Sequence, residues 1–159
     1  MRSILLLALA ALSLSCGGSP VDLVANLAVD IVETGWYDAG IVNGQNKLVP
    51  AAKVTVRNNS NQKLPMLQIN SLFRRVNETE EWGSAFVTAA GSEGLDPGAV
   101  KGPILLRSNN GYTGSDQSRQ DMLKNTQFID AKVQLFAKYA SIQWVKKGEF
   151  PIERKLLEK

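Results

Sequence analysis

Two short segments in which apolar and polar residues alternate limit what this chain can fold into. Residues 53–57 read Lys-Val-Thr-Val-Arg, and residues 67–73 repeat the alternation after the polar stretch 58–63, which is rich in Asn. A period of two places every second side chain on the buried face of a β-strand. Asn and Ser bond locally to the backbone and favour chain reversal. The pattern therefore predicts a β-hairpin over residues 52–76.

Further segments with strand character follow one another along the chain, and helical periodicity is almost absent. One helical turn is expected at 121–125, and several short strands divided by turn signals indicate an all-β protein, a single antiparallel β-sandwich. The other expected strands are 25–31, 82–88, 102–107, 129–139, 142–146 and 150–154. The residues expected in the core are Val54, Val56, Ile69, Phe73, Val133, Leu135 and Trp144.

A resemblance agrees with this fold class. Residues 54–59 (Val-Thr-Val-Arg-Asn-Asn), with the strand at 64–73 after them, resemble the strand–Asn–strand pattern of immunoglobulin-like domains in bacterial surface lipoproteins. The resemblance implies an immunoglobulin-like β-sandwich of about seven strands. We place this domain at residues 25–159.

The N-terminus has the features of a secretory leader. Arg2 precedes an apolar run at 4–12, which is shorter than the roughly 20 residues that span a membrane. A small residue, Ser15, stands directly before the single cysteine, Cys16, and this arrangement resembles the lipobox of bacterial lipoproteins. The resemblance implies a signal peptide at 1–15, cleavage before Cys16 and a diacylglycerol on its sulfur.

Two further points bear on the leader. The alternative is a plain secretory signal whose cleavage region happens to contain a cysteine, although a secreted protein has little use for one unpaired thiol. Under the lipoprotein interpretation, residues 16–24 are the lipidated cysteine and a tether to the domain. Lipoprotein processing would supply several acyl chains, and more than one chain is needed for stable anchoring.

Composition excludes several function classes. Removal of residues 1–15 leaves 144 residues with 17 basic and 15 acidic side chains, a balance that gives no electrostatic case for nucleic-acid binding. Histidine is absent, so Ser-His-Asp and Cys-His catalysis and histidine zinc sites are excluded. We expect no metal, no cofactor and no enzymatic activity, and an enzyme built on carboxylates is the remaining catalytic alternative.

Two stretches contain candidate binding residues. Trp36 and Tyr37 lie in a glycine-flanked turn at 34–40, where they either bind a ligand or protein or cap one end of the core. Residues 89–120 form a long irregular stretch, and loops of this length often carry function. Within it, Asn110 and Tyr112 are the expected contacts of an exposed binding loop. The alternative is an ordinary connection with Pro-Gly and Asn-Gly turns.

Two charged stretches have simpler interpretations. Glu78, Glu80 and Glu81 lack the separation of glycosidase carboxylates and the spacing of a calcium loop, so we expect a solvated turn. The segment 132–159 is basic. It either contacts anionic lipid or an acidic partner, or it is a solvated sheet face followed by a frayed tail.

These features together predict a cell-envelope lipoprotein that acts as a non-enzymatic adaptor or accessory subunit of a membrane-associated complex. Its expected partners are the membrane, through the N-terminal lipid, and an envelope protein. Gly17 follows the cysteine where an Asp signals inner-membrane retention in enterobacterial lipoproteins, so the resemblance implies the periplasmic face of the outer membrane in an organism with two membranes. The alternative function is a periplasmic or surface binding module for a small ligand or glycan.

Overall fold

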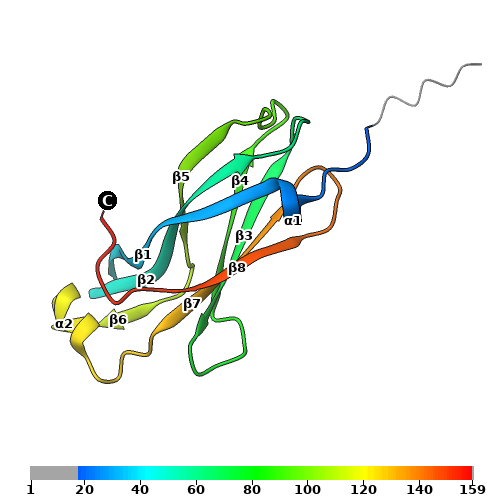
Figure 1. Cartoon of the computed structure of the whole chain (residues 1–159). Helices are drawn as coiled ribbons and strands as arrows, with labels where there is room; N and C mark the ends of the chain where they lie inside the picture. Colours follow the sequence, from blue (N-terminus) through cyan, green and yellow to red (C-terminus); the bar gives the residue numbers. More distant parts are fainter. Residues whose placement is uncertain (1–17, 159) are drawn as a thin grey trace, which may run out of the picture.

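The computed structural model describes residues 18–158, and these form eight strands and two short helices (Figure 1). The signal peptide predicted at 1–15 and the lipidation predicted at Cys16 lie outside the described residues. The elements in chain order are α1 (Leu23–Asn26), β1 (Leu27–Val42), β2 (Gln45–Asn58), β3 (Leu67–Arg75), β4 (Gly83–Ala90), β5 (Val100–Arg107), β6 (Tyr112–Gly114), α2 (Arg119–Lys124), β7 (Ala131–Lys138) and β8 (Val145–Pro151).

The strands form two antiparallel sheets that pack against each other. One sheet has the order β1–β2–β5, with β6 pairing with another part of β2, and the other has the order β4–β3–β7–β8. The predicted all-β sandwich is confirmed. The first two strands belong to one sheet and the third to the other, as in immunoglobulin domains, where strands A and B pair in one sheet and C lies in the facing one.

The core lies between the inner faces of the two sheets. Side chains of β7 alternate between buried and half-buried along the whole strand, as the period-two pattern at 129–139 predicts. Six of the seven predicted core residues are buried: Val54, Val56, Ile69, Phe73, Val133 and Leu135. The prediction that Trp144 is a core residue is wrong. The residue is 38% exposed, and its ring lies outside the core, against Phe86 and Lys138.

The hairpin predicted at 52–76 is also wrong. β2 and β3 belong to different sheets, so the link between them carries the chain across the sandwich. The hairpin that does form joins β1 to β2. Its turn has Asn43 at φ 52° and Gly44 at φ 78°, and two left-handed residues in an Asn-Gly pair are the signature of a type I′ turn.

Asn58 shapes the link between the sheets. Its side chain is fully buried, and its amide nitrogen donates to the carbonyls of Gln62 at 2.7 Å and Leu95 at 2.9 Å. Its amide oxygen accepts from the backbone N–H of Ser60 at 3.0 Å. These bonds turn the chain and tie it to the segment before β5, so the polar stretch serves as a corner rather than a hairpin loop.

The first strand begins later and runs further than the sequence indicates. The Asp22 side chain accepts from the Val24 N–H, and this cap begins α1 where residues 25–31 predict a strand. The stretch 34–40, expected as a turn, lies inside β1. Backbone pairing holds it there, because Trp36 is opposite Pro50 in β2 and also bonds to the C-terminal segment.

Later elements differ in smaller ways. The stretch 89–120 contains β5, as the strand predicted at 102–107 indicates, but also β6 and the start of α2. α2 corresponds to the predicted helical turn at 121–125. β8 is one strand that passes through Gly148, with a register shift opposite Leu135, where two separate strands are expected from the sequence.

Replacement of Asn58 by Ala tests the corner. The Asn58→Ala variant should lose about 1–3 kcal/mol of unfolding free energy, because it removes the hydrogen bonds that this fully buried amide side chain makes. The measurement is urea unfolding of the mature protein. Asn61→Ala, at an exposed position in the same link, should change stability by less than about 0.5 kcal/mol. Equal stability of the two variants would show that the Asn58 bonds do not organise the corner.

Candidate functional site

Four aromatic rings gather at the end of the sandwich that carries α2. Trp36 from β1, Trp82 from the β3–β4 turn, Tyr112 from β6 and Phe128 from the segment after α2 form this aromatic cluster. The ring centroids of Trp36 and Phe128 are 4.4 Å apart, and those of Tyr112 and Phe128 are 4.6 Å apart. The Trp82 and Tyr112 centroids are 4.9 Å apart. The tilted and edge-on contacts are the favourable arrangements for aromatic pairs.

Backbone pairing fixes Trp36 within the cluster. Its N–H donates to the Lys155 carbonyl at 2.8 Å, and its carbonyl accepts from the Leu157 N–H at 2.9 Å. The C-terminal segment therefore pairs along the edge of β1, and Leu157 is buried. The alternative of a frayed tail after the sheet is therefore wrong for residues 155–157, which pair with β1.

Tyr112 is placed by the pairing of β6 with β2, in which it lies opposite Leu48. A Cβ atom at the preceding Gly111 would lie 2.0 Å from the Leu48 carbonyl oxygen, so only glycine permits this close approach. The Tyr112 hydroxyl donates to the Ile129 carbonyl at 3.3 Å. The ring is thus held at one edge of the cluster with one side toward α2.

Phe128 is fixed from the opposite side. Its N–H donates to the Asn125 carbonyl at 3.0 Å, just after α2 ends. The Arg154 guanidinium donates to the Phe128 carbonyl at 2.9 Å and lies 5.3 Å from the centre of the Phe128 ring. These contacts hold the segment after α2 against the sandwich.

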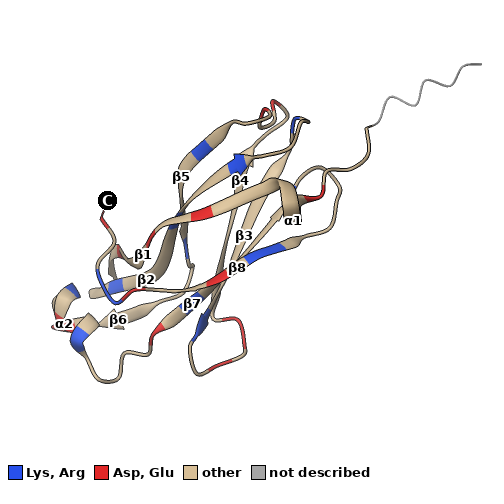
Figure 2. Ribbon diagram, in the orientation of Figure 1, with Lys and Arg blue, Asp and Glu red and all other residues tan. Residues whose placement is uncertain are grey.

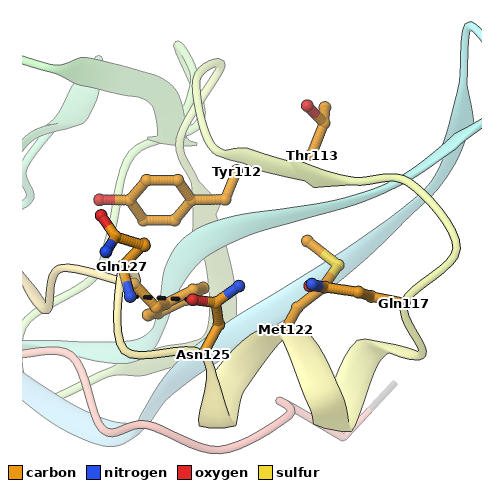
Figure 3. A pocket seen from close by; sticks show the side chains of 7 residues that line it. Tyr112, Thr113, Gln117, Met122, Asn125 and Gln127 are labelled. Carbon is orange, nitrogen blue, oxygen red and sulfur yellow. Dashed lines mark hydrogen bonds between the residues drawn. The ribbon is translucent and has the colours of Figure 1, made fainter.

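A cavity of about 130 Å³ opens between Tyr112, Phe128 and α2 (Figure 3). Its apolar walls are the two rings and Met122, and the remaining lining is one hydroxyl and three amides. All of the lining residues are uncharged: Tyr112, Thr113, Gln117, Met122, Asn125, Gln127 and Phe128. Such a lining suits a neutral group that packs on a ring and bonds to an amide.

Local bonds hold the polar part of the lining. The Gln127 N–H donates to the Asn125 side-chain oxygen at 2.8 Å, as the dashed line in Figure 3 shows. The Gln117 carbonyl accepts from the Asn46 side chain at 2.7 Å, which ties the segment between β6 and α2 to β2. The side chains of Gln117 and Gln127 have no such role, so they are available to a ligand's polar atoms.

The structure brings two of the four predicted binding residues together. Trp36 is fully buried, so it caps the core as the alternative interpretation predicts, and Tyr112 lies beside it. Tyr37 faces the opposite side of β1, with the Arg107 guanidinium 5.1 Å from its ring centre. Asn110 is exposed, and its amide donates to the Trp82 carbonyl at 2.6 Å.

The expectation that Tyr112 sits in an exposed loop is wrong, because it is half-buried in a strand and packs on three rings. The site also contains residues that the sequence does not indicate: Trp82, Met122, Gln127 and Phe128. Met122 and Phe128 do lie in and just after the predicted helical turn. Nothing in their local pattern indicates that this turn folds over Tyr112.

Several of the charged residues form ion pairs. Glu78 pairs with Arg75 at 2.8 Å in the β3–β4 turn, and Arg154 pairs with Asp130 at 2.7 Å. Glu149 lies 3.2 Å from Lys132, and hydrogen bonds from Gln134 and Lys132 lower the pKa of its carboxyl. Figure 2 shows basic and acidic residues interspersed along the ribbon. Over residues 18–158, no group of three or more His, Cys, Asp or Glu side chains could hold a metal ion.

The chain matches no model of a known protein family and no curated protein sequence. In the part of the chain that the structure describes, no helix has the length and apolar character to cross a membrane. The leader and the aromatic cluster with its cavity are therefore the features of this chain that indicate a function.

Removal of the Tyr112 ring tests its place in the cluster. Tyr112→Ala should lower the unfolding free energy by about 2–4 kcal/mol, because three ring contacts are lost from a half-buried site. Tyr112→Phe keeps the ring and loses the hydroxyl with its bond to Ile129, so it should cost about 0.5–1.5 kcal/mol. Urea unfolding measures both. A Tyr112→Ala variant as stable as the parent would place the ring outside the cluster.

Proposed function

We propose that this protein is a cell-envelope lipoprotein, anchored through Cys16, that acts as a non-enzymatic adaptor. In this proposal the cavity receives one uncharged side chain of a protein partner in a membrane-associated complex. The leader and the serine before the lone cysteine support the anchor. The size and chemistry of the cavity support the adaptor role.

The cavity volume carries the argument for a protein partner. Sites that enclose a drug-sized molecule have volumes of about 300–1,000 Å³. The cavity here, at about 130 Å³, is close to the roughly 150 Å³ that accommodates a benzene ring. One apolar or aromatic side chain fits such a space, and interfaces are often anchored by a single side chain that fills a pocket.

The surroundings of the cavity are also those of a protein contact. Thr113 and Gln127 are exposed and Gln117 is half-buried, so polar groups surround an apolar interior. Polar surroundings of this kind exclude water from a central anchor residue. The rings below are held by the core, which means that the pocket is formed before a partner arrives and binding orders little of the chain.

The binding of a glycan is the second candidate, and one observation favours it. A tyrosine ring next to amide side chains provides both an apolar face and hydrogen-bonding groups, which a sugar ring requires. The volume limits this candidate to the end of one sugar unit. A free monosaccharide that displaces the protein partner would favour it.

Filling the cavity tests the adaptor role. Gln127→Trp should place a bulky ring at the cavity opening and reduce recovery of a stoichiometric partner at least tenfold, because loss of an anchor contact costs about 1.4 kcal/mol or more. The lipidated protein is purified from detergent-solubilised membranes after crosslinking. Thr126→Trp is the matched control, since Thr126 is an exposed neighbour that does not line the cavity. Equal partner recovery with both variants would contradict the proposal.

Removal of the anchor tests the lipoprotein assignment. Cys16→Ala should abolish incorporation of labelled fatty acid and move the protein from the membrane fraction to the soluble one. Stable anchoring needs more than one acyl chain, and the variant carries none. Fractionation of the outer and inner membranes of the parent strain then locates the wild-type protein. If the variant is processed normally and still sediments with membranes, the anchor is not at Cys16.

A further inference from the structure

The N-terminal segment is fixed to the sandwich almost from its first described residues. The Val21 N–H donates to the Tyr139 hydroxyl at 2.5 Å, and Val21 and Leu23 are both buried. The Gln62 side chain donates to the Ser19 carbonyl at 3.2 Å. Of the tether predicted at 16–24, the part from Val21 onward is therefore attached to the domain, and Val21 and Leu23 belong to its core.

A lysine completes this attachment. Lys147 in β8 donates to the carbonyls of Leu23 at 2.6 Å and Val24 at 3.3 Å, the first two residues of α1. Burial lowers the pKa of its ammonium group. The N-terminal segment is thus bonded to Tyr139 just after β7, to β8 and to the β2–β3 link, and it has little freedom to swing away from this end of the molecule.

The fixed segment limits the distance between the domain and an anchor at Cys16. Five residue steps separate Cys16 from Val21. An extended chain spans at most about 3.6 Å per residue, so Val21 lies within roughly 18 Å of the modified cysteine. A lipid on Cys16 would keep this end of the sandwich close to the membrane surface.

Several connecting segments gather at the same end, which we call the N-terminal end: residues 18–26, 59–66, 91–99 and 139–144 (Figure 1). The Met66 N–H donates to the Gly91 carbonyl at 2.7 Å, and the Ala140 N–H donates to the Pro65 carbonyl at 3.1 Å. In Figure 1 the start of the described chain, in blue, lies beside the 139–144 segment, in orange.

The N-terminal end carries exposed apolar side chains. Val24 is 70% exposed, Met66 42% and Trp144 38%. Phe86, 56% exposed, lies next to Trp144 with the ring centroids 6.2 Å apart. The Lys138 ammonium lies 5.1 Å from the centre of the Trp144 ring. Tryptophan beside lysine is the combination that favours the boundary between acyl chains and headgroups.

We propose that the N-terminal end rests on a phospholipid surface, with Val24, Met66 and Trp144 in contact with the lipid and Lys138 among the headgroups. The proposal rests on lipidation of Cys16, because the short connection is what brings these side chains to the membrane. Trp36 follows the start of β1 by nine residues, roughly 30 Å of strand. The aromatic cluster and its cavity then face away from the membrane.

Quenching of tryptophan fluorescence by lipid tests this orientation. The lipidated protein is reconstituted into phosphatidylcholine–phosphatidylglycerol vesicles whose acyl chains are brominated, and its emission is compared with that in unbrominated vesicles. The chain has three tryptophans, and two of them, Trp36 and Trp82, belong to the distant cluster. Bromine should quench the share of the emission that Trp144 contributes.

Two variants identify the quenched residue. Trp144→Phe should lose the quenching, whereas Trp82→Phe, the matched control, should keep the quenched component while removing an unquenched one. Wild-type protein that sediments with the vesicles but shows no quenching would overturn the proposal. The same holds if Trp144→Phe is quenched as strongly as the wild type, because the other end of the molecule would then face the lipid.

Two additional measurements separate the possible failures. The mass of the purified protein reports lipidation of Cys16: an unlipidated protein that does not sediment with vesicles refutes both the proposed anchor and this orientation. A lipidated protein without Trp144 quenching refutes the orientation alone. If Trp144 mediates self-association, the wild type will be a dimer in detergent and Trp144→Phe a monomer, an outcome that also overturns the lipid contact.

Discussion

The rest of the structure depends on the packing of the two inner sheet faces against each other. Val54 in β2 and Ile69, Phe73, Val133 and Leu135 in β3 and β7 are all fully buried between the layers. Interiors of this kind are packed as densely as organic crystals, so each strand must keep its register for the next to fit. The connections, the aromatic cluster and the N-terminal attachment are all positioned by strands whose register this packing sets.

The positions of strands could be predicted where they depend on the alternation of neighbouring residues. The pairing of strands could not be predicted where it depends on residues far away in the sequence. β7 alternates over its whole length because one face meets the core and the other meets solvent, and the sequence shows this directly. The 58–63 stretch is different. A polar link of this length can close a hairpin or cross to the facing sheet, and the deciding bond joins Asn58 to Leu95, 37 residues away. The position of Trp144 differs from the prediction for a related reason, since hydrophobic character alone does not show on which side of a strand end a ring lies.

The site shows the same division. Trp36 and Tyr112 could be singled out because large aromatic residues beside glycines suggest a special environment, and the structure does bring them together. The role of Tyr112 as a wall of a cavity depends on Phe128 and Met122, which reach it only when α2 folds back beside β6. Tyr37 and Trp36 are neighbours in sequence but face opposite sides of β1, as adjacent residues in a strand must. A pair that looks like one feature in the sequence is therefore two unrelated positions in the fold.

The two ends of the sandwich suit different tasks, and this separation has a physical consequence for an anchored protein. The connection to Cys16 is short, and Tyr139 and Lys147 fix the chain that follows it, so the domain cannot rotate freely about a flexible stalk. With Cys16 lipidated as proposed, the long strand β1 acts as a spacer between the membrane and the aromatic cluster. A partner would meet the cavity at a set height above the lipid and in a restricted orientation, and both restrictions raise the effective concentration of the two surfaces. A pocket for a single side chain gives limited affinity by itself, so this arrangement explains how a small cavity could suffice for an adaptor in a membrane-associated complex.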